Sequence, residues 1–499
     1  MNNVVNIASA KPGTGKTQSF IKAVDGSKNI VLAVPTKILS EDVRSRFERK
    51  GIIATVINSE THQTNIKGCV ESELRNTKSI GSVVIVTQKT LQDINPAYLS
   101  GWKVVLDEVP DITNVQTKDI GENLFKDAFD HLITWDEKGN VSIQDGKEFD
   151  VRIRLLEAGC DISMSTQTLV FSALLKPNAE VKIKVDKKKN PLKYWVNIID
   201  YHDYKNIIKF CDEFHIMGNA IEKSLFYHYV VANGFEIKVS EYTPAHKPYK
   251  MKPTLLPLFE GKKYSKRMLL QGGDGERMSY GSVGYKAVER ALSYIDGEEV
   301  LFQGNIWMSD PGAFPFKKYN NVKIIPSDAR GMNTYSSVNY SIHMMHGNPK
   351  TNLKNSYSRM LKMMGVDKEL GMAVIRHEMS TERTIQGITR TPIRKFEEQK
   401  KATVHIVPTL EEAKKLEIEL GVECFIDESI MVKTPPTVTV SKRDEEKQIV
   451  WELYKQGLSY RAIGDKVGKV ASTISNWIRE IKEEKETQEK YHEDIEMAA

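Results

Sequence analysis

A glycine-rich loop close to the amino terminus constrains this chain more than any other stretch. It follows an apolar run at residues 4–8 and precedes a helix-compatible stretch at residues 18–23. A strand, a glycine loop and a helix N-terminus in that order direct backbone N–H groups and the positive end of the helix dipole at one point, which favours a bound polyanion. The sequence therefore predicts a nucleoside triphosphate site, with ATP as ligand and Mg²⁺ as its ion. The predicted binding residues are Ala10, Lys11, Pro12, Gly13, Thr14, Gly15, Lys16 and Thr17.

The strict P-loop pattern has Gly where this chain has Ala10, but Gly13 and Gly15 keep the backbone freedom that the loop needs. We expect Lys16 to reach the β and γ phosphates and the Thr17 hydroxyl to bind Mg²⁺. Apolar runs then alternate with helix-compatible stretches, which is typical of a parallel α/β sheet with ligands at the carboxyl ends of its strands. The runs lie at residues 30–36, 52–57, 83–88, 104–108 and 169–173.

Asp107 and Glu108 end the fourth of these runs. A phosphate loop needs one carboxylate that holds Mg²⁺ and a second that orients the attacking water. We therefore expect Asp107 to bind Mg²⁺ together with Thr17, and Glu108 to act as the general base. A strand that ends in Asp-Glu is also a common start to a solvated loop, but its place after a phosphate loop in an α/β pattern favours catalysis.

In order and spacing, five short motifs resemble the first half of the motif set of superfamily 2 helicases. The resemblance implies RecA-like domains that hydrolyse ATP, with Pro35, Thr36, Thr87 and Gln88 on nucleic acid and a Ser-Ala-Thr segment, here residues 172–174, that couples hydrolysis to strand movement. This chain departs from the family where Pro110 replaces His or Asp and where Leu174 replaces the last Thr. The motifs are residues 10–17, 34–36, 86–88, 107–110 and 172–174.

Two later stretches, residues 327–333 and 386–394, resemble the fifth and sixth motifs of the same family. The resemblance implies that Arg330 and Gly331 contact nucleic acid and that Gln386, Arg390 and Arg394 are catalytic. An arginine from a second domain neutralises γ-phosphate charge only when the cleft closes, which suits it to the role of finger. Either Arg390 or Arg394 fits that role.

The accessory segment, residues 176–285, shows no helicase pattern. Its basic stretch at residues 182–189 precedes Tyr194 and Trp195, a mixture that nucleic-acid surfaces use for phosphate contact and base stacking. A solvated hairpin with an exposed lysine turn fits these residues equally well.

Three short helices are expected after a proline-rich linker, with a glycine-bearing turn before the third. The pattern resembles the helix-turn-helix of resolvases and transposases, although a small protein-binding module also fits. As a helix-turn-helix it would read DNA with Ser472, Thr473, Ser475, Asn476 and Arg479.

We therefore expect two RecA-like parallel-sheet domains, an inserted or accessory segment and a C-terminal all-α helix-turn-helix domain. The expected ranges are 1–175 for the first RecA-like domain, 176–285 for the accessory segment, 286–428 for the second domain, 429–442 for the linker and 443–499 for the helix-turn-helix with its acidic tail.

Composition places few limits on the function. A net charge of +5 permits a nucleic-acid partner, and the four scattered cysteines have no spacing that suits zinc or a disulfide framework. No apolar run has the length that a membrane span needs. We expect a cytoplasmic protein, in the host cytoplasm if the source is viral, with no membrane partner.

These features together predict an ATP-dependent DNA helicase or translocase that a C-terminal reader directs to particular sites such as a replication origin. Single- or double-stranded DNA and other replication proteins are the expected partners, and the arrangement is similar to origin-binding helicases of viruses and phages. A double-stranded DNA translocase or packaging ATPase that does not separate strands is one alternative. An ATP-switched DNA-binding regulator is another, against which Glu108 and the paired arginines argue.

Overall fold

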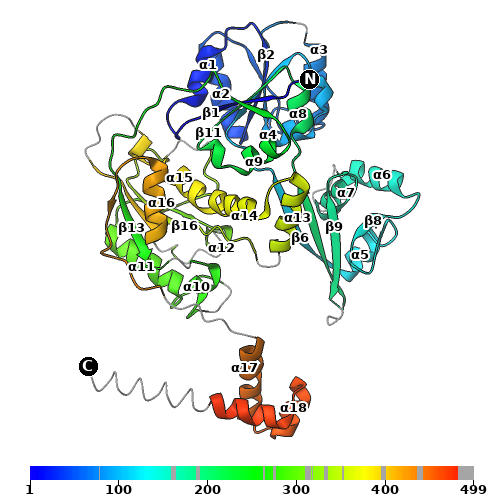
Figure 1. The fold of residues 1–499 in the computed structure, drawn as a ribbon, viewed down its shortest axis with the longest axis vertical. Helices are drawn as coiled ribbons and strands as arrows, with labels where there is room; N and C mark the ends of the chain where they lie inside the picture. The colour runs from blue at the N-terminus through cyan, green and yellow to red at the C-terminus, as the bar shows by residue number, and fades with distance from the viewer. Residues whose placement is uncertain are drawn as a thin grey trace. The chain divides into compact units, whose positions relative to one another are not determined.

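The computed structural model describes two compact units, residues Met1–Thr434 and Pro435–Ala499 (Figure 1). The larger unit contains two parallel sheets, a three-stranded antiparallel sheet and a two-stranded antiparallel sheet. The described residues are 1–77, 79–158, 165–186, 191–261, 264–273, 277–309, 316, 319–330, 335–350, 353–394, 401–434 and 442–481. Among them, no helix combines the length and the apolar character that crossing a bilayer requires.

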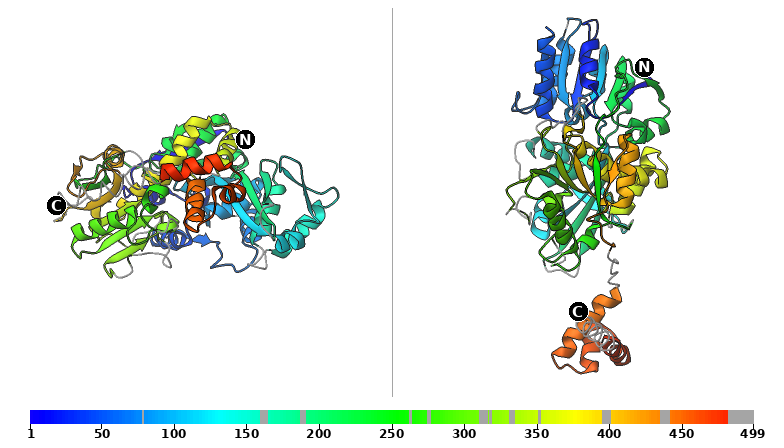
Figure 2. Two further views of the ribbon diagram at one scale, coloured as in Figure 1. Left: turned by 90° about the horizontal axis from the view of Figure 1, so that it is seen from below. Right: turned by 90° about the vertical axis from the view of Figure 1, so that its left-hand side faces the viewer.

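The first domain is built on a seven-stranded parallel sheet in the order β12-β1-β11-β5-β2-β4-β3. Its strands are β1 (Val4–Ser9), β2 (Asn29–Val34), β3 (Ala54–Val56), β4 (Val83–Thr87), β5 (Trp102–Asp107), β11 (Glu213–Gly218) and β12 (Glu236–Val239). Helices cover both faces, which explains why the central strands read as nearly continuous apolar runs (Figure 2). One face carries α1 (Lys16–Ala23) and α2 (Lys37–Arg49), and the other carries α3 (Ile66–Asn76), α4 (Gln88–Asp93), α8 (Lys205–Phe210) and α9 (Leu225–Ala232).

The strand expected at residues 169–173 is wrong, because these residues lie in helix α7 (Ser165–Leu174). A short apolar run fits a buried helix as well as a buried strand, and here Val170, Phe171 and Ala173 are buried against the small sheet. The expected accessory range of 176–285 also differs from the structure. It contains β11 and β12, which complete the first sheet, and β13 (Thr254–Phe259), which belongs to the second.

The small sheet is inserted between β5 and β11, which are neighbours in the first sheet. It has the antiparallel order β6-β10-β9, with strands β6 (Thr113–Gly121), β9 (Glu180–Asp186) and β10 (Lys193–Tyr201). One face packs on α5 (Glu122–Ala128) and α7. Helix α6 (Glu148–Ala158) and the hairpin of β7 (Ile133–Trp135) and β8 (Val141–Ile143) complete this insertion (Figure 1).

The second domain is built on six parallel strands in the order β15-β14-β16-β17-β13-β18. Besides β13 these are β14 (Val300–Gly304), β15 (Val322–Ile325), β16 (Tyr340–Met344), β17 (Val404–Thr409) and β18 (Phe425–Ile426). Helices α10 (Lys266–Leu270), α11 (Val283–Ile295) and α12 (Ile306–Ser309) pack on one face. The other face carries α15 (Arg383–Ile388) and α16 (Leu410–Leu420). Helices α13 (Lys354–Met364) and α14 (Lys368–His377) extend into the apolar cluster of the first domain, and a π-helical turn at Glu378–Glu382 joins α14 to α15.

A chain of buried polar side chains crosses the second sheet. Gln303 Nε2 donates to the backbone oxygen of Arg383 at 3.1 Å, so Gln303 Oε1 faces His343 Nδ1 at 2.7 Å and accepts from it. Ser341 Oγ therefore donates to His343 Nε2 and accepts from His405 Nδ1, each at 2.7 Å. Burial lowers the pKa of His343 to about 3, which keeps this chain neutral.

The smaller unit contains the three expected helices, α17 (Lys442–Lys455), α18 (Tyr460–Val467) and residues 471–481. Ser459 caps α18 through Ala462 N, and Gly468 ends it with φ of +67°. Its core consists of Val450, Ile463, Ile474, Trp477 and Ile478. On the third helix Thr473 is half-buried, and Ser472, Ser475, Asn476 and Arg479 are exposed. The predicted class, parallel α/β domains followed by an all-α unit, is confirmed.

Candidate functional site

The glycine-rich loop joins β1 to α1 in the geometry that the sequence predicts. Gly13 and Gly15 have φ of +82° and +88°, a region that favours glycine. Ala10 does not have a positive φ, and its N–H donates to the carbonyl of Gly218 at 2.9 Å. Alanine therefore fits at this position, and the departure from the strict P-loop pattern leaves the loop intact.

The outer side of the loop is held by residues beyond the first sheet. Lys11 Nζ donates to the backbone oxygen of Leu420 at 2.6 Å, at the C-terminal end of α16. The Tyr249 hydroxyl donates to Pro12 O at 2.7 Å, and Thr14 Oγ1 donates to Lys11 O at 2.7 Å. A cation at a helix C-terminus is favoured by the helix dipole, so Lys11 links the loop to the second domain.

Lys16, Thr17 and Asp107 come together at the inner side of the loop. Lys16 Nζ donates to the carbonyls of Ala10 at 2.7 Å and Lys11 at 3.2 Å. Thr17 Oγ1 lies 3.0 Å from both carboxylate oxygens of Asp107. Burial, and then the Glu108 charge, raise the pKa of Asp107 to about 7, so a nearby cation would stabilise its ionised form. Hydroxyl and carboxylate oxygens are ligands that suit Mg²⁺, which would bridge to phosphate oxygens and neutralise their charge.

Glu108 follows β5 with a strained backbone, because its φ is +85°. Its N–H donates to Met217 O, and its carbonyl accepts from Gln88 Nε2, both at 2.8 Å. Strained residues that neighbouring groups hold in place are common at active sites. The side chain of Gln88, predicted to contact nucleic acid, therefore also fixes the backbone of the expected general base.

One cavity brings together the predicted catalytic residues of both domains, with the exception of Gln386. Arg394 lies against the loop, so that a Cβ added at Gly13 would be 2.8 Å from Arg394 Cβ. Arg390 is buried, and its Nη2 donates to Gln386 Oε1 at 3.1 Å. Gln386 thus holds Arg390 through this hydrogen bond and is not among the residues that line the cavity. The lining residues are Gly13, Gly15, Lys16, Thr17, Gln18, Leu39, Arg46, Asp107, Glu108, Ser336, Arg390 and Arg394.

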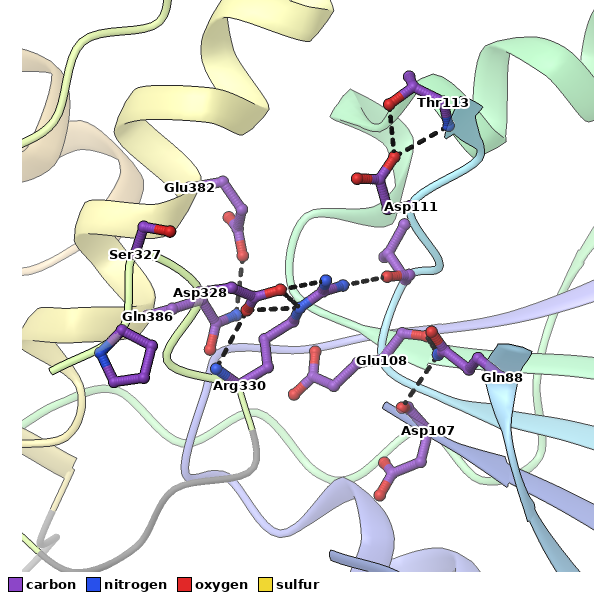
Figure 3. Close-up of polar contacts among 12 residues, drawn as sticks. Gln88, Asp107, Glu108, Asp111, Thr113, Ser327, Asp328, Arg330, Glu382 and Gln386 are labelled. Atoms are coloured by element: carbon purple, nitrogen blue, oxygen red, sulfur yellow. Dashed lines mark hydrogen bonds and ion pairs between the residues drawn. The ribbon is translucent and has the colours of Figure 1, made fainter. Parts of the chain in front are cut away.

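A hydrogen-bond network that the sequence did not predict crosses from the first domain to the second. Asn219, directly after β11, donates through Nδ2 to Glu382 Oε2 at 2.8 Å. Gln386 Nε2 donates to Glu382 Oε1 at 2.8 Å, which continues the network to Arg390. Part of Glu382 is accessible, but its carboxyl group lies deep enough that burial raises its pKa to about 7. Glu382 therefore joins the first domain to the arginine at the cavity beside the glycine-rich loop, and Figure 3 shows the Glu382–Gln386 part of this network.

The segment at residues 172–174, expected to couple hydrolysis to movement, does not lie at the carboxyl end of a strand of the first sheet. Ser172 and Ala173 lie on α7 in the insertion, whereas the loop Gly218-Asn219-Ala220 follows the strand between β1 and β5. This loop contacts the phosphate loop through Gly218 O and the second domain through Asn219. The run at residues 214–217, apolar except for His215 and closed by Gly218, is the signal that could have identified this loop.

A second cavity contains four of the predicted nucleic-acid residues, Pro35, Thr36, Gln88 and Arg330. Arg330 Nη1 donates to Val109 O at 2.6 Å and its guanidinium pairs with Asp328, as Figure 3 shows. The other lining residues are Lys89, Gln92, Asp111, His202 and Asp328. Thr87 instead caps α4 through Thr90 N at 3.2 Å and is not among the lining residues, while Gly331 lies outside the described residues.

No family model and no curated protein matches this chain. Among solved structures, it is similar to S. tokodaii Xpd4, with a TM-score of 0.44 and 11% identity over 85% of this chain and 96% of the other. An XPD helicase gives a TM-score of 0.47 and 10% identity over the same shares. S. cerevisiae Dbp5 bound to RNA and ADP BeF3 gives 0.32 and 14% identity over 86% of this chain and 85% of that one.

Proposed function

We propose that this chain is an ATP-driven motor on nucleic acid, of the superfamily 2 helicase type. The observation that carries the proposal is the shared cavity, in which the phosphate loop, Asp107 and Glu108 of one domain face Arg390 and Arg394 of another. Arginines that complete the site from a second domain tie hydrolysis to domain closure, because developing phosphate charge is stabilised only in the closed state.

The cavity around Arg330 supplies the second half of the proposal. It lies beside the carboxyl ends of β2, β4 and β5, and Asp328 and Arg330 bring the second domain to the same place. A strand bound there would contact both domains, so that closure on ATP and opening after hydrolysis would move the two contact points relative to each other. Bound nucleic acid would in turn favour closure and stimulate hydrolysis.

The experiment is ATP hydrolysis with no nucleic acid, single-stranded DNA, duplex DNA and RNA, for the intact chain, Lys16→Ala and Glu108→Gln. We expect stimulation by one nucleic acid, and a loss of at least about 100-fold in both variants. Lys22→Ala, an exposed lysine on the same helix as Lys16, is the matched control and should behave as the intact chain does. A rate of ATP hydrolysis that none of the nucleic acids changes would contradict the proposal of a motor and would favour an ATP-switched regulator.

We further propose that the track is DNA and that the smaller unit directs the motor to a particular sequence, such as a replication origin. Exposed Asn476 and Arg479 on its third helix support this, since such side chains bond base edges and phosphates. Selection of duplexes from a random pool by the full chain should enrich one sequence, and Asn476→Ala with Arg479→Ala should abolish the enrichment. An unenriched pool would contradict site-directed binding, and a strand-separation assay beside a triplex-displacement assay distinguishes a helicase from a duplex translocase.

A further inference from the structure

The small antiparallel sheet has one face that the insertion does not cover. Directly paired residues on neighbouring strands point to the same side, and the register places Trp195 opposite Lys184 on one strand and Asp119 on the other. The next row toward the first domain has the same orientation. Together the two rows contain Asp119, Trp195, Lys184, Thr117, Asn197 and Lys182.

The opposite face of this sheet is its apolar core. Tyr194 is buried there, and its ring stacks on Phe125 with centroids 3.9 Å apart. The two neighbouring aromatic side chains thus lie on opposite faces of the sheet. Tyr194 lies in the core, and Trp195 lies half-exposed on the other face. Further along that face, Ile199 packs in the same apolar cluster as Met360 of α13. Helix α13 therefore covers the end of the face nearest the first domain and leaves the Trp195 rows open.

The charges on the open rows favour an anionic partner. Lys193 Nζ lies 2.7 Å from Asp119, whose charge it neutralises, and 4.7 Å from the centre of the Trp195 ring. Lys184 is exposed and Lys182 is half-buried. Within the part of the chain that the structure describes, neither of these two lysines forms an ion pair with a carboxylate.

The open rows lie on the strands whose ends flank the Arg330 cavity, with α13 over the rows between them. Asp111 and His202, which line that cavity, lie just before the start of β6 and just after the end of β10. Trp195 is six residues from the end of β10 at Tyr201, which is about 20 Å along a strand. A single strand that leaves the cavity and passes α13 would therefore span the distance to Trp195 in a few nucleotides.

We propose that this face is a second nucleic-acid contact, which holds single-stranded nucleic acid by stacking an unpaired base on Trp195 and by contacts of Lys182 and Lys184 with phosphates. The inference rests on the proposed function and extends its track beyond the two parallel-sheet domains. A single strand is the occupant because a base in a duplex has no free face to stack on an indole. Stacking is tolerant of sequence, so the contact would hold any strand that the motor moves.

The test is binding of a labelled single strand of mixed sequence, long enough to span the Arg330 cavity and Trp195, to the full chain. Trp195→Ala should weaken binding by about 5- to 150-fold, the range expected for one lost stacking contact. Trp195→Phe keeps a ring and should retain most of the affinity. The double variant Lys182→Ala, Lys184→Ala should bind with a shallower salt dependence. The slope of the logarithm of the binding constant against the logarithm of the salt concentration should fall in magnitude by about 1.4, the value for contacts with two phosphates of a single strand.

Lys126→Ala is the matched control, because Lys126 is an exposed lysine on α5 at the other side of the insertion. It should bind as the intact chain does, and duplex binding should be unchanged in all variants. The inference alone would be overturned if the tryptophan and lysine variants both bound with the affinity and salt slope of the intact chain while Arg330→Ala weakened binding. Failure of the intact chain to bind any single strand would overturn the proposed function as well.

Discussion

The contact between Asn219 and Glu382 is expected to control how tightly the nucleotide cavity closes. The amide donates to a carboxylate across the two domains at 2.8 Å, so Asn219→Ala removes one hydrogen bond that exists only when the domains are together. A hydrogen bond to a charged group contributes about 1.5–3 kcal/mol, and one to a neutral group contributes about 0.5–1.5 kcal/mol. The loss therefore depends on whether Glu382 is ionised.

Glu382 has a pKa raised to about 7 by burial, so it is mostly ionised above that pH and mostly protonated below it. At about pH 8.5 Asn219→Ala should lower kcat/KM for ATP by about 10- to 150-fold, and at about pH 6 by about 2- to 10-fold. The assay is nucleic-acid-stimulated ATP hydrolysis over this pH range, with kcat/KM of the variant divided by kcat/KM of the intact chain at each pH.

Asn76→Ala is the matched control, since it removes an amide hydrogen bond to Ser72 on the exposed side of α3. Its kcat/KM should equal that of the intact chain at every pH. A loss in Asn219→Ala that is the same at both ends of the range would show that the charge of Glu382 has no part in closure. An Asn219→Ala variant with full activity would refute the contact altogether.

Three further changes test other parts of the structure. Glu378 has a pKa raised to about 8, mainly by burial, so its stabilising contribution is full below its ordinary pKa of 4.5 and is lost as pH rises through 8. The free energy of unfolding of Glu378→Gln should therefore rise relative to that of the intact chain from pH 5 to 8.5, by about a few kcal/mol, as denaturant titrations at each pH would measure. A difference that stays constant with pH would contradict this. Lys11→Ala removes the ammonium group from the C-terminal end of α16 and should raise KM for ATP about 5-fold, whereas Lys11→Arg should leave KM unchanged. A KM of Lys11→Ala equal to that of the intact chain would disprove the link between the loop and the second domain. Ser341→Ala leaves one buried ring nitrogen of His343 and one of His405 without its partner, and should lower the free energy of unfolding by about 2–4 kcal/mol. A denaturant titration measures this loss, and an unchanged midpoint would refute the expectation.

The geometry of the proposed nucleotide site could be predicted from sequence because each of its parts is local. A glycine loop between a strand and a helix, and a strand that ends in Asp107 and Glu108, are short patterns. The parallel sheet brings them together, since the carboxyl ends of its strands share one edge. Only the family resemblance indicates Arg390 and Arg394, and their place at the cavity depends on how the second domain packs.

The network through Glu382 could not be predicted in the same way. Its bond to Asn219 joins residues 163 positions apart on different domains, and no periodicity marks either of them. The misassigned segment at Ser172 has a related cause. Its apolar run has the composition of a strand, and only the long-range pairing of β11 with β1 and β5 shows which strand completes the sheet.

The strand order has a consequence for how the chain folds during synthesis. The phosphate-loop strand β1 pairs only with β11 and β12 in the first sheet, and β11 begins at Glu213. At about 5–20 residues per second, the ribosome makes β1 roughly 10–40 s before its first partner. The nascent chain must therefore carry an unpaired apolar strand while the whole insertion is translated, which makes the amino-terminal residues a target for chaperones and the insertion a timer for assembly of the active site.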